Sequence, residues 1–237
     1  MSLKEDWHTA VADVYRAFSG YDFPANMEAA PKHDVPRIMS ALSSTSLAKL
    51  SPDCLGPFAA SALYTIGSAD DYKHFLPRIL ELSLIDGKWI GFEPEVIAAK
   101  LIYANWMDWP ANERTAIWRL FDAGWRLSRE ADPEINPSDS FLCANCRLGS
   151  PIDGLVSGWL PLNGPLAALQ LALVVDALSQ IAEGTIYWED VEQQQRDQLR
   201  TWIESESVWW ALTAAAPTVP EDHRWMVEQA LNRLRRH

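Results

Sequence analysis

The chain has 237 residues, 48% of them hydrophobic and 22% charged, which excludes the disordered, collagen-like and membrane-spanning classes. Its 32 acidic and 20 basic residues give a formal net charge of -12, which argues against nucleic acid or anionic lipid as a partner. A soluble globular protein is therefore expected. Because there are only three cysteines and no signal-peptide pattern at the N-terminus, we predict a cytoplasmic location.

Helical periodicity is clear in the first part of the chain. It predicts a helix between Leu3 and Phe18 and a shorter helix over residues 34–43. Apolar residues spaced three and four apart predict a further helix over residues 52–66. Ser51 is suited to cap its N-terminus, and Gly67 is suited to the left-handed conformation that closes a helix.

A second helix is predicted to follow directly. Ser68 is expected to cap it, with Asp71 completing a capping box. The helix should extend to about residue 86, with a kink at Pro77. Because the connection to the preceding helix is so short, the two are predicted to form an antiparallel hairpin.

A shift of 42 residues aligns this hairpin with the sequence that follows it. The shift places Pro52 on Pro94 and Phe75 on Ile117, so a second hairpin of the same design is predicted. A period of this length is typical of HEAT-like helical repeats. Helix pairs of common length can also match by coincidence, so an irregular helical array is the alternative.

The helical pattern is interrupted after Arg129. Residues 132–138 are predicted to form a linker, and residues 141–164 to form short helical turns and irregular chain. Residues 165–183 are apolar on nearly every side apart from Gln170 and one aspartate, which predicts a central buried helix. Three more helices are predicted, over residues 188–204, 206–215 and 220–235.

These patterns together predict an all-α fold, because no segment alternates as a strand does. We expect about eight to ten helices, packed as antiparallel hairpins in a HEAT-like or irregular array. An N-terminal hairpin region, residues 1–130, and a C-terminal helical region, residues 131–237, are expected to form one continuous domain.

The acidic residues are concentrated in one part of the chain. Residues 130–195 hold ten acids and one base, Arg147, so that this stretch alone carries a charge of -9. Such a stretch is either a solvated surface or a docking face for a positively charged protein.

Two groups of residues are candidates for metal binding or chemistry. Cys143 and Cys146 form a CxxC pair, which could bind zinc with help from Cys54, His33 or His74, could act as a redox pair, or could simply be buried. Asp70, Asp71 and His74 share one helical turn and could bind a metal or transfer a proton. The two aspartates are equally explained as first-turn acids that interact with the helix dipole.

The twelve tryptophans are unusually many for this length. Most are expected in the core, where large rings fill the gaps between helices. Trp209 and Trp210 are adjacent, so both cannot point into one core from the same helix. An exposed tryptophan is a typical anchor of a protein interface, which makes this pair a candidate binding site.

One segment carries a resemblance to known sequences. Residues 51–82, and above all the run DYKHFLPR at residues 71–78, resemble a family of uncharacterised bacterial proteins. That family tends to have closely spaced cysteines upstream, whereas residues 21–35 here have none. The resemblance implies a bacterial origin and a helical fold, and it implies no activity.

Catalysis is not expected, because the chain lacks a GxSxG, an HExxH and a phosphate-binding glycine loop. We predict a non-catalytic interaction module with an acidic face and no cofactor, resembling an immunity protein or antitoxin that neutralises a basic partner. The alternative is a metal-binding protein or enzyme that uses Asp70, Asp71 and His74, or Cys143 and Cys146. The predicted partner-binding residues are Glu189, Asp190, Glu192, Trp209 and Trp210.

Overall fold

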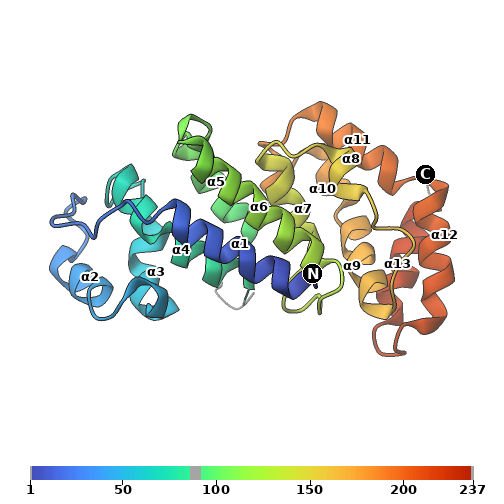
Figure 1. Ribbon diagram of the computed structural model, residues 1–237. Coiled ribbons are helices and arrows are strands. Elements are labelled where there is room, and N and C mark those ends of the chain that lie inside the picture. The colour runs from blue at the N-terminus through green and yellow to red at the C-terminus, as the bar shows by residue number, and fades with distance from the viewer. Residues whose placement is uncertain (1, 86–91, 236–237) are drawn as a thin grey trace. The chain divides into compact units, whose positions relative to one another are not determined.

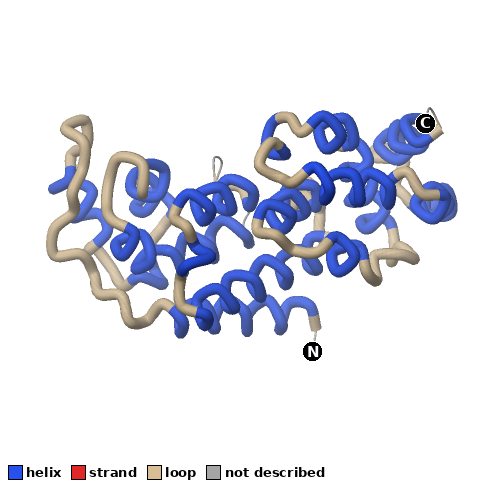
Figure 2. Tube along the Cα trace, turned by 90° about the horizontal axis from the view of Figure 1, so that it is seen from above, coloured by secondary structure: helices blue, strands red, loops and turns tan. Residues whose placement is uncertain are grey.

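The computed structural model describes residues 2–85 and 92–235 (Figure 1). These residues form helices and loops and no β-strand, which confirms the predicted all-α class (Figure 2). Backbone contacts divide the chain into two compact units, Met1–Leu120 and Phe121–His237. The division falls inside a helix.

Unit 1 contains α1 (Leu3–Ala17), α2 (Val35–Leu42), the 3-10 turn η1 (Leu47–Lys49), α3 (Pro52–Ser61), α4 (Ala69–Ile85), α5 (Pro94–Tyr103), η2 (Trp106–Asp108) and the first half of α6 (Ala111–Ser128). Unit 2 contains the rest of α6, α7 (Ser138–Arg147), α8 (Ile152–Val156), α9 (Pro165–Asp176), α10 (Leu178–Glu183), η3 (Ile186–Trp188), α11 (Gln193–Ile203), α12 (Glu206–Ala215), η4 (Ala216–Thr218) and α13 (Arg224–Leu234). The expected number of helices was too small, because the apolar segment breaks at Ala177 into α9 and α10 and because short helices such as α8 form between the longer ones.

The helix predicted over residues 52–66 is shorter than expected, since α3 ends at Ser61. Leu63 has a left-handed backbone with φ of +72°, and Ile66 forms one isolated backbone bridge with Ala29, in the loop that follows α1, and another with Ala62. Pairing with a distant loop therefore replaces the last helical turn. Gly67 adopts the predicted left-handed conformation, with φ of +75°, but it follows this turn and does not close the helix.

A buried lysine from α5 caps the end of α3. The Lys100 ammonium donates to the carbonyl oxygens of Ala60, at 3.1 Å, and Ala62, at 3.2 Å, and it lies 4.3 Å from the ring centroid of Tyr64. The lysine is only 4% exposed, and burial lowers its pKa to about 8. Its side chain thus satisfies carbonyls that the missing helical turn would have used.

Lys100→Met is expected to remove a pH-dependent contribution to stability. Because the folded protein binds this proton less tightly than the unfolded chain does, the free energy of unfolding rises with pH between the two pKa values. We expect a rise of about 1–2 kcal/mol between pH 7 and pH 9.5 in the wild-type protein relative to the variant. Urea unfolding at both pH values measures it, and parallel pH profiles for the two proteins would contradict it.

The predicted capping box of α4 is confirmed. The backbone N–H of Ser68 donates to the Asp71 carboxylate at 2.7 Å, and the Asp71 N–H donates to the Ser68 hydroxyl at 3.1 Å. The helix continues through Pro77 to Ile85, and the predicted end at residue 86 lies outside the described residues. It packs against α1, α3 and α5.

Helix boundaries in this part of the chain recur at an interval of 42 residues. Pro52 begins α3 and Pro94 begins α5, and the starts of α4 and α6, at residues 69 and 111, have the same separation. The non-glycine left-handed residues Leu63 and Asn105 are also 42 positions apart. The starts of these helices and the two left-handed residues thus share one interval.

Gln170 anchors a loop to the apolar helix α9 of unit 2. Its amide NH₂ donates to the carbonyls of Ala131 and Asn136, both at 2.9 Å, and its oxygen accepts the N–H of Ser138 at 2.8 Å. Gln170, the one polar residue buried in α9, therefore satisfies the backbone of the predicted linker.

The segment Pro165–Glu183 is long and apolar enough to cross a membrane, but 61% of it is buried inside the structure.

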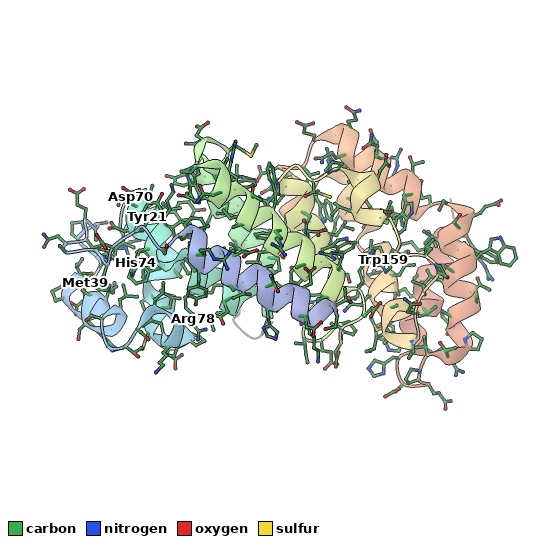
Figure 3. The ribbon with its side chains drawn as sticks, viewed as in Figure 1. Tyr21, Met39, Asp70, His74, Arg78 and Trp159 are labelled. Atoms are coloured by element: carbon green, nitrogen blue, oxygen red, sulfur yellow. The ribbon has the colours of Figure 1, made fainter. Side chains whose placement is uncertain are left out.

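Tryptophans form much of the interior, as expected. In unit 2 the Trp125 indole N–H donates to the carbonyl of Leu155 at 2.9 Å, and its ring meets Trp159 edge to face at 4.9 Å. Trp159, labelled in Figure 3, also stacks on Trp202 at 5.5 Å. The buried tryptophans of the two units are Trp7, Trp106, Trp109, Trp125, Trp159 and Trp188.

Candidate interaction surface

Three of the predicted partner-binding residues lie close together on unit 2. Glu189, Asp190 and Glu192 are all exposed, in the short connection between η3 and α11. No ion pair joins Glu189 or Glu192 to a basic side chain within the part of the chain that the structure describes. Asp190 differs, because it pairs with Arg147, whose side chain is only 4% exposed. Only the two glutamates keep their charge available to a partner.

An exposed apolar pair lies directly before these acids. Ile186 is 54% exposed and Tyr187 is 44% exposed. No sequence pattern had marked either residue as part of a binding site. Ile186 has a φ of +59°, which is a rare and unfavourable backbone conformation for a β-branched residue. Such strain is typically found at functional positions. We call residues 183–192 the acidic tip.

The acidic tip is held firmly in spite of its exposure. Trp188 and Val191 are buried, so the residues that follow the apolar pair are fixed in the core. The Cys143 thiol of α7 donates to the carbonyl of Tyr187 at 3.4 Å. The tip therefore presents its apolar side chains from a fixed backbone, which lowers the entropy lost on binding.

The basic residue nearest in sequence to the tip is turned toward the protein. The Arg196 guanidinium donates to the carbonyls of Ile181 and Ala182 at the end of α10, at 3.2 and 3.3 Å, and to that of Val191 at 3.1 Å. It lies so close to Gly184, which has a φ of +64°, that an added Cβ would be 2.3 Å from Nη1. Arg196 therefore serves as a cap for the C-terminus of α10.

The predicted pair Trp209 and Trp210 lies on a different helix, α12. Trp210 is 61% exposed, Trp209 is half-buried, and their ring centroids are 4.6 Å apart. Helix α12 packs against α9 and α13, whereas η3 packs against α7 and α10. The elements that carry the acidic tip and the tryptophan pair thus have different packing partners.

The cysteine pair lies in the interior of unit 2. Cys143 and Cys146 are one turn apart on α7 and both are buried. Burial raises the pKa of the Cys146 thiol to about 12, which keeps it protonated, and a protonated thiol is a poor metal ligand and a poor nucleophile. Among the described residues, no three or more His, Cys, Asp or Glu side chains are grouped where they could hold a metal ion.

Asp70, Asp71 and His74 each have a separate environment. Asp71 belongs to the capping box, and Asp70 is exposed. The His74 ring donates from Nδ1 to the backbone carbonyl of Tyr21 at 2.7 Å, and these two residues lie together in Figure 3. The hydrogen bonds of Asp71 and His74 give both residues a structural role and do not direct them to a common site.

A buried polar cluster in unit 1 had no counterpart in the sequence prediction. The Lys73 ammonium lies 3.0 Å from a carboxylate oxygen of Glu113 and donates to the Tyr21 hydroxyl at 2.8 Å, which donates in turn to Glu113 at 2.7 Å. The ammonium also lies 4.4 Å from the ring centroid of Trp109. Lys73 is only 6% exposed.

Residues 71–78, DYKHFLPR, have a structural role in unit 1. The consecutive residues Lys73 and His74 bind the hydroxyl and the carbonyl of Tyr21 and so attach the loop after α1 to α4. Arg78 donates to the carbonyl of Leu50 at 2.8 Å. Comparisons of the chain with protein-family models, with curated proteins and with solved structures find no match.

Proposed function

We propose that the protein is a non-catalytic helical interaction module and that its acidic tip docks onto a basic protein. The observation that carries this proposal is Ile186, an exposed β-branched residue in a left-handed conformation. It has an exposed tyrosine beside it, Glu183 before it, and Glu189 and Glu192 after it. An apolar centre with a charged rim is the usual anatomy of a protein interface.

The recurrence of helix boundaries supports the same proposal. If the hairpins that begin at Pro52 and Pro94 are two copies of one repeat, this part of the chain belongs with helical repeats, which often serve as scaffolds for binding. Neutralisation of a basic toxin, as by an immunity protein or antitoxin, is the specific role we propose. Trp209 and Trp210 remain a predicted second contact.

The proposal can be tested by photocrosslinking in cells that produce the protein. With a benzophenone amino acid in place of Tyr187, we expect a covalent adduct with a protein that has a basic surface. Glu189→Lys combined with Glu192→Lys should abolish the adduct, because rim charges steer association. Asp190 is left intact because its loss would leave Arg147 buried without this partner.

A matched control is available in the same unit. Glu221 and Glu228 are also exposed acids, so that Glu221→Lys with Glu228→Lys changes the net charge equally without touching the tip. This control should keep the adduct. The proposal fails if the tip variant keeps the adduct, or if the control loses it to the same extent.

Ile186→Asn is expected to stabilise the protein while it weakens binding. Asparagine tolerates the left-handed conformation, so its introduction should relieve strain and raise the free energy of unfolding by about 1 kcal/mol. The variant also removes the apolar centre of the tip and should reduce the crosslink. Ile135, an exposed isoleucine without a positive φ, supplies the control Ile135→Asn, which should not stabilise. A fall in Tm for Ile186→Asn would contradict the prediction that the backbone at Ile186 is strained.

A further inference from the structure

A second surface, on unit 1, has the opposite charge to the acidic tip. A cavity of about 550 Å³, open to solvent, lies between α1 and the first half of α6. Asp13, Arg16 and Ala17 line it from α1, and Asn112, Ala116 and Arg119 are among the residues that line it from α6. Its volume is within the range of small-molecule binding sites.

Two arginines share one carboxylate at this cavity. Arg16 Nη1 donates to one Asp13 oxygen at 2.8 Å, and Arg119 Nη1 donates to the other. The three side chains together carry one excess positive charge, in a protein whose net charge is -12. The Asp13 side chain is 18% exposed, whereas those of Arg16 and Arg119 are 75% and 43% exposed. The guanidinium groups are therefore much more open to a ligand than the carboxylate.

Both arginines have donors to spare for a ligand in the cavity. Each guanidinium has five N–H donors, and the bond to Asp13 uses only one nitrogen of each. Ala17 and Ala116 have small side chains and leave space between the helices. Asp13 also holds the two guanidinium groups near one another, so a ligand does not need to bring them together.

We infer that this cavity binds a small organic anion, whose carboxylate or phosphate group interacts with both Arg16 and Arg119. Guanidinium groups bind carboxylates and phosphates through paired, charge-assisted hydrogen bonds. This inference does not depend on the proposed function, because the acidic tip lies in the other unit.

The test is an NMR titration of the full chain that follows the arginine Nε–Hε signals at constant ionic strength. Inorganic phosphate and citrate are the two probes, which separate phosphate recognition from carboxylate recognition. Saturable shifts of the Arg16 and Arg119 signals with either probe support the inference. The Kd should rise about tenfold in Arg119→Gln, because a charged hydrogen-bonding group is lost.

Two further variants keep the test decisive. Arg200→Gln removes an arginine of equal exposure, 43%, from α11 and should leave the Kd unchanged. Thr115→Phe narrows the cavity from an exposed position without a change of charge and should weaken binding as well. The inference is overturned if neither probe gives saturable shifts, or if Arg200→Gln weakens binding as much as Arg119→Gln does.

Discussion

Lys73→Met is expected to lower the free energy of unfolding by about 3–5 kcal/mol, because it leaves the buried Glu113 carboxylate without its counter-ion. Lys73 and Glu113 are 6% and 4% exposed, so water cannot replace the lost partner. The Tyr21 hydroxyl would still donate to Glu113, but one hydrogen bond from a neutral donor does not compensate for a buried charge. Urea unfolding followed by tryptophan fluorescence measures the loss.

The double variant Lys73→Met with Glu113→Leu separates the ion pair from its packing. An apolar pair of similar volume removes both charges, so much of the lost stability should return. Tyr21→Phe removes two hydrogen bonds to charged groups but keeps the ion pair, so it should cost less than Lys73→Met, about 1–3 kcal/mol. A double variant as unstable as Lys73→Met alone would show that the charges are not the cause.

Gln170→Leu is expected to destabilise unit 2 by about 3–5 kcal/mol, because it removes the partners of three backbone groups at once. Gln170 and Ser138 are both 0% exposed, so solvent cannot replace the lost partner of the Ser138 N–H. Leucine would suit the apolar helix α9 better than glutamine does. A calculation from buried apolar area alone would therefore predict that Gln170→Leu stabilises unit 2.

The helix α11 offers a control for this change. Gln198 is exposed, so Gln198→Leu alters the same residue type at no cost in buried hydrogen bonds and should change stability by less than about 0.5 kcal/mol. Gln170→Glu should remain strongly destabilising at neutral pH, because a carboxylate cannot donate to the two carbonyls. If Gln170→Leu unfolds at the same urea concentration as the wild-type protein, the loop does not depend on this side chain.

The features that sequence predicted well are local ones. Two examples depend only on residues within one helical turn of each other. They are the capping box of Ser68 and Asp71, and the prolines at which α3 and α5 begin. The early end of α3 depends instead on backbone pairing with a distant loop and on Lys100 from another helix. No local pattern contains that information, because the competing contacts come from elsewhere in the chain.

At the candidate surface, too, the sequence predicted local features but not those that depend on distant contacts. A count of charges located the acidic stretch, but it could not show that Asp190 is paired with Arg147 and that Arg196 faces inward. Ile186 gave no signal, since an isoleucine is ordinarily predicted to be buried. Its exposure and its left-handed φ of +59° are visible only in the folded structure.

The positions of the thiols make the opening of unit 2 observable. Cys143 and Cys146 are buried in α7 of unit 2, whereas Cys54, in α3 of unit 1, is partly exposed. Alkylation requires the thiolate, and burial keeps the Cys146 pKa at about 12. Mass-resolved alkylation of Cys143 and Cys146 therefore records when unit 2 opens, without an added label, whereas the partly exposed Cys54 is accessible in the folded protein.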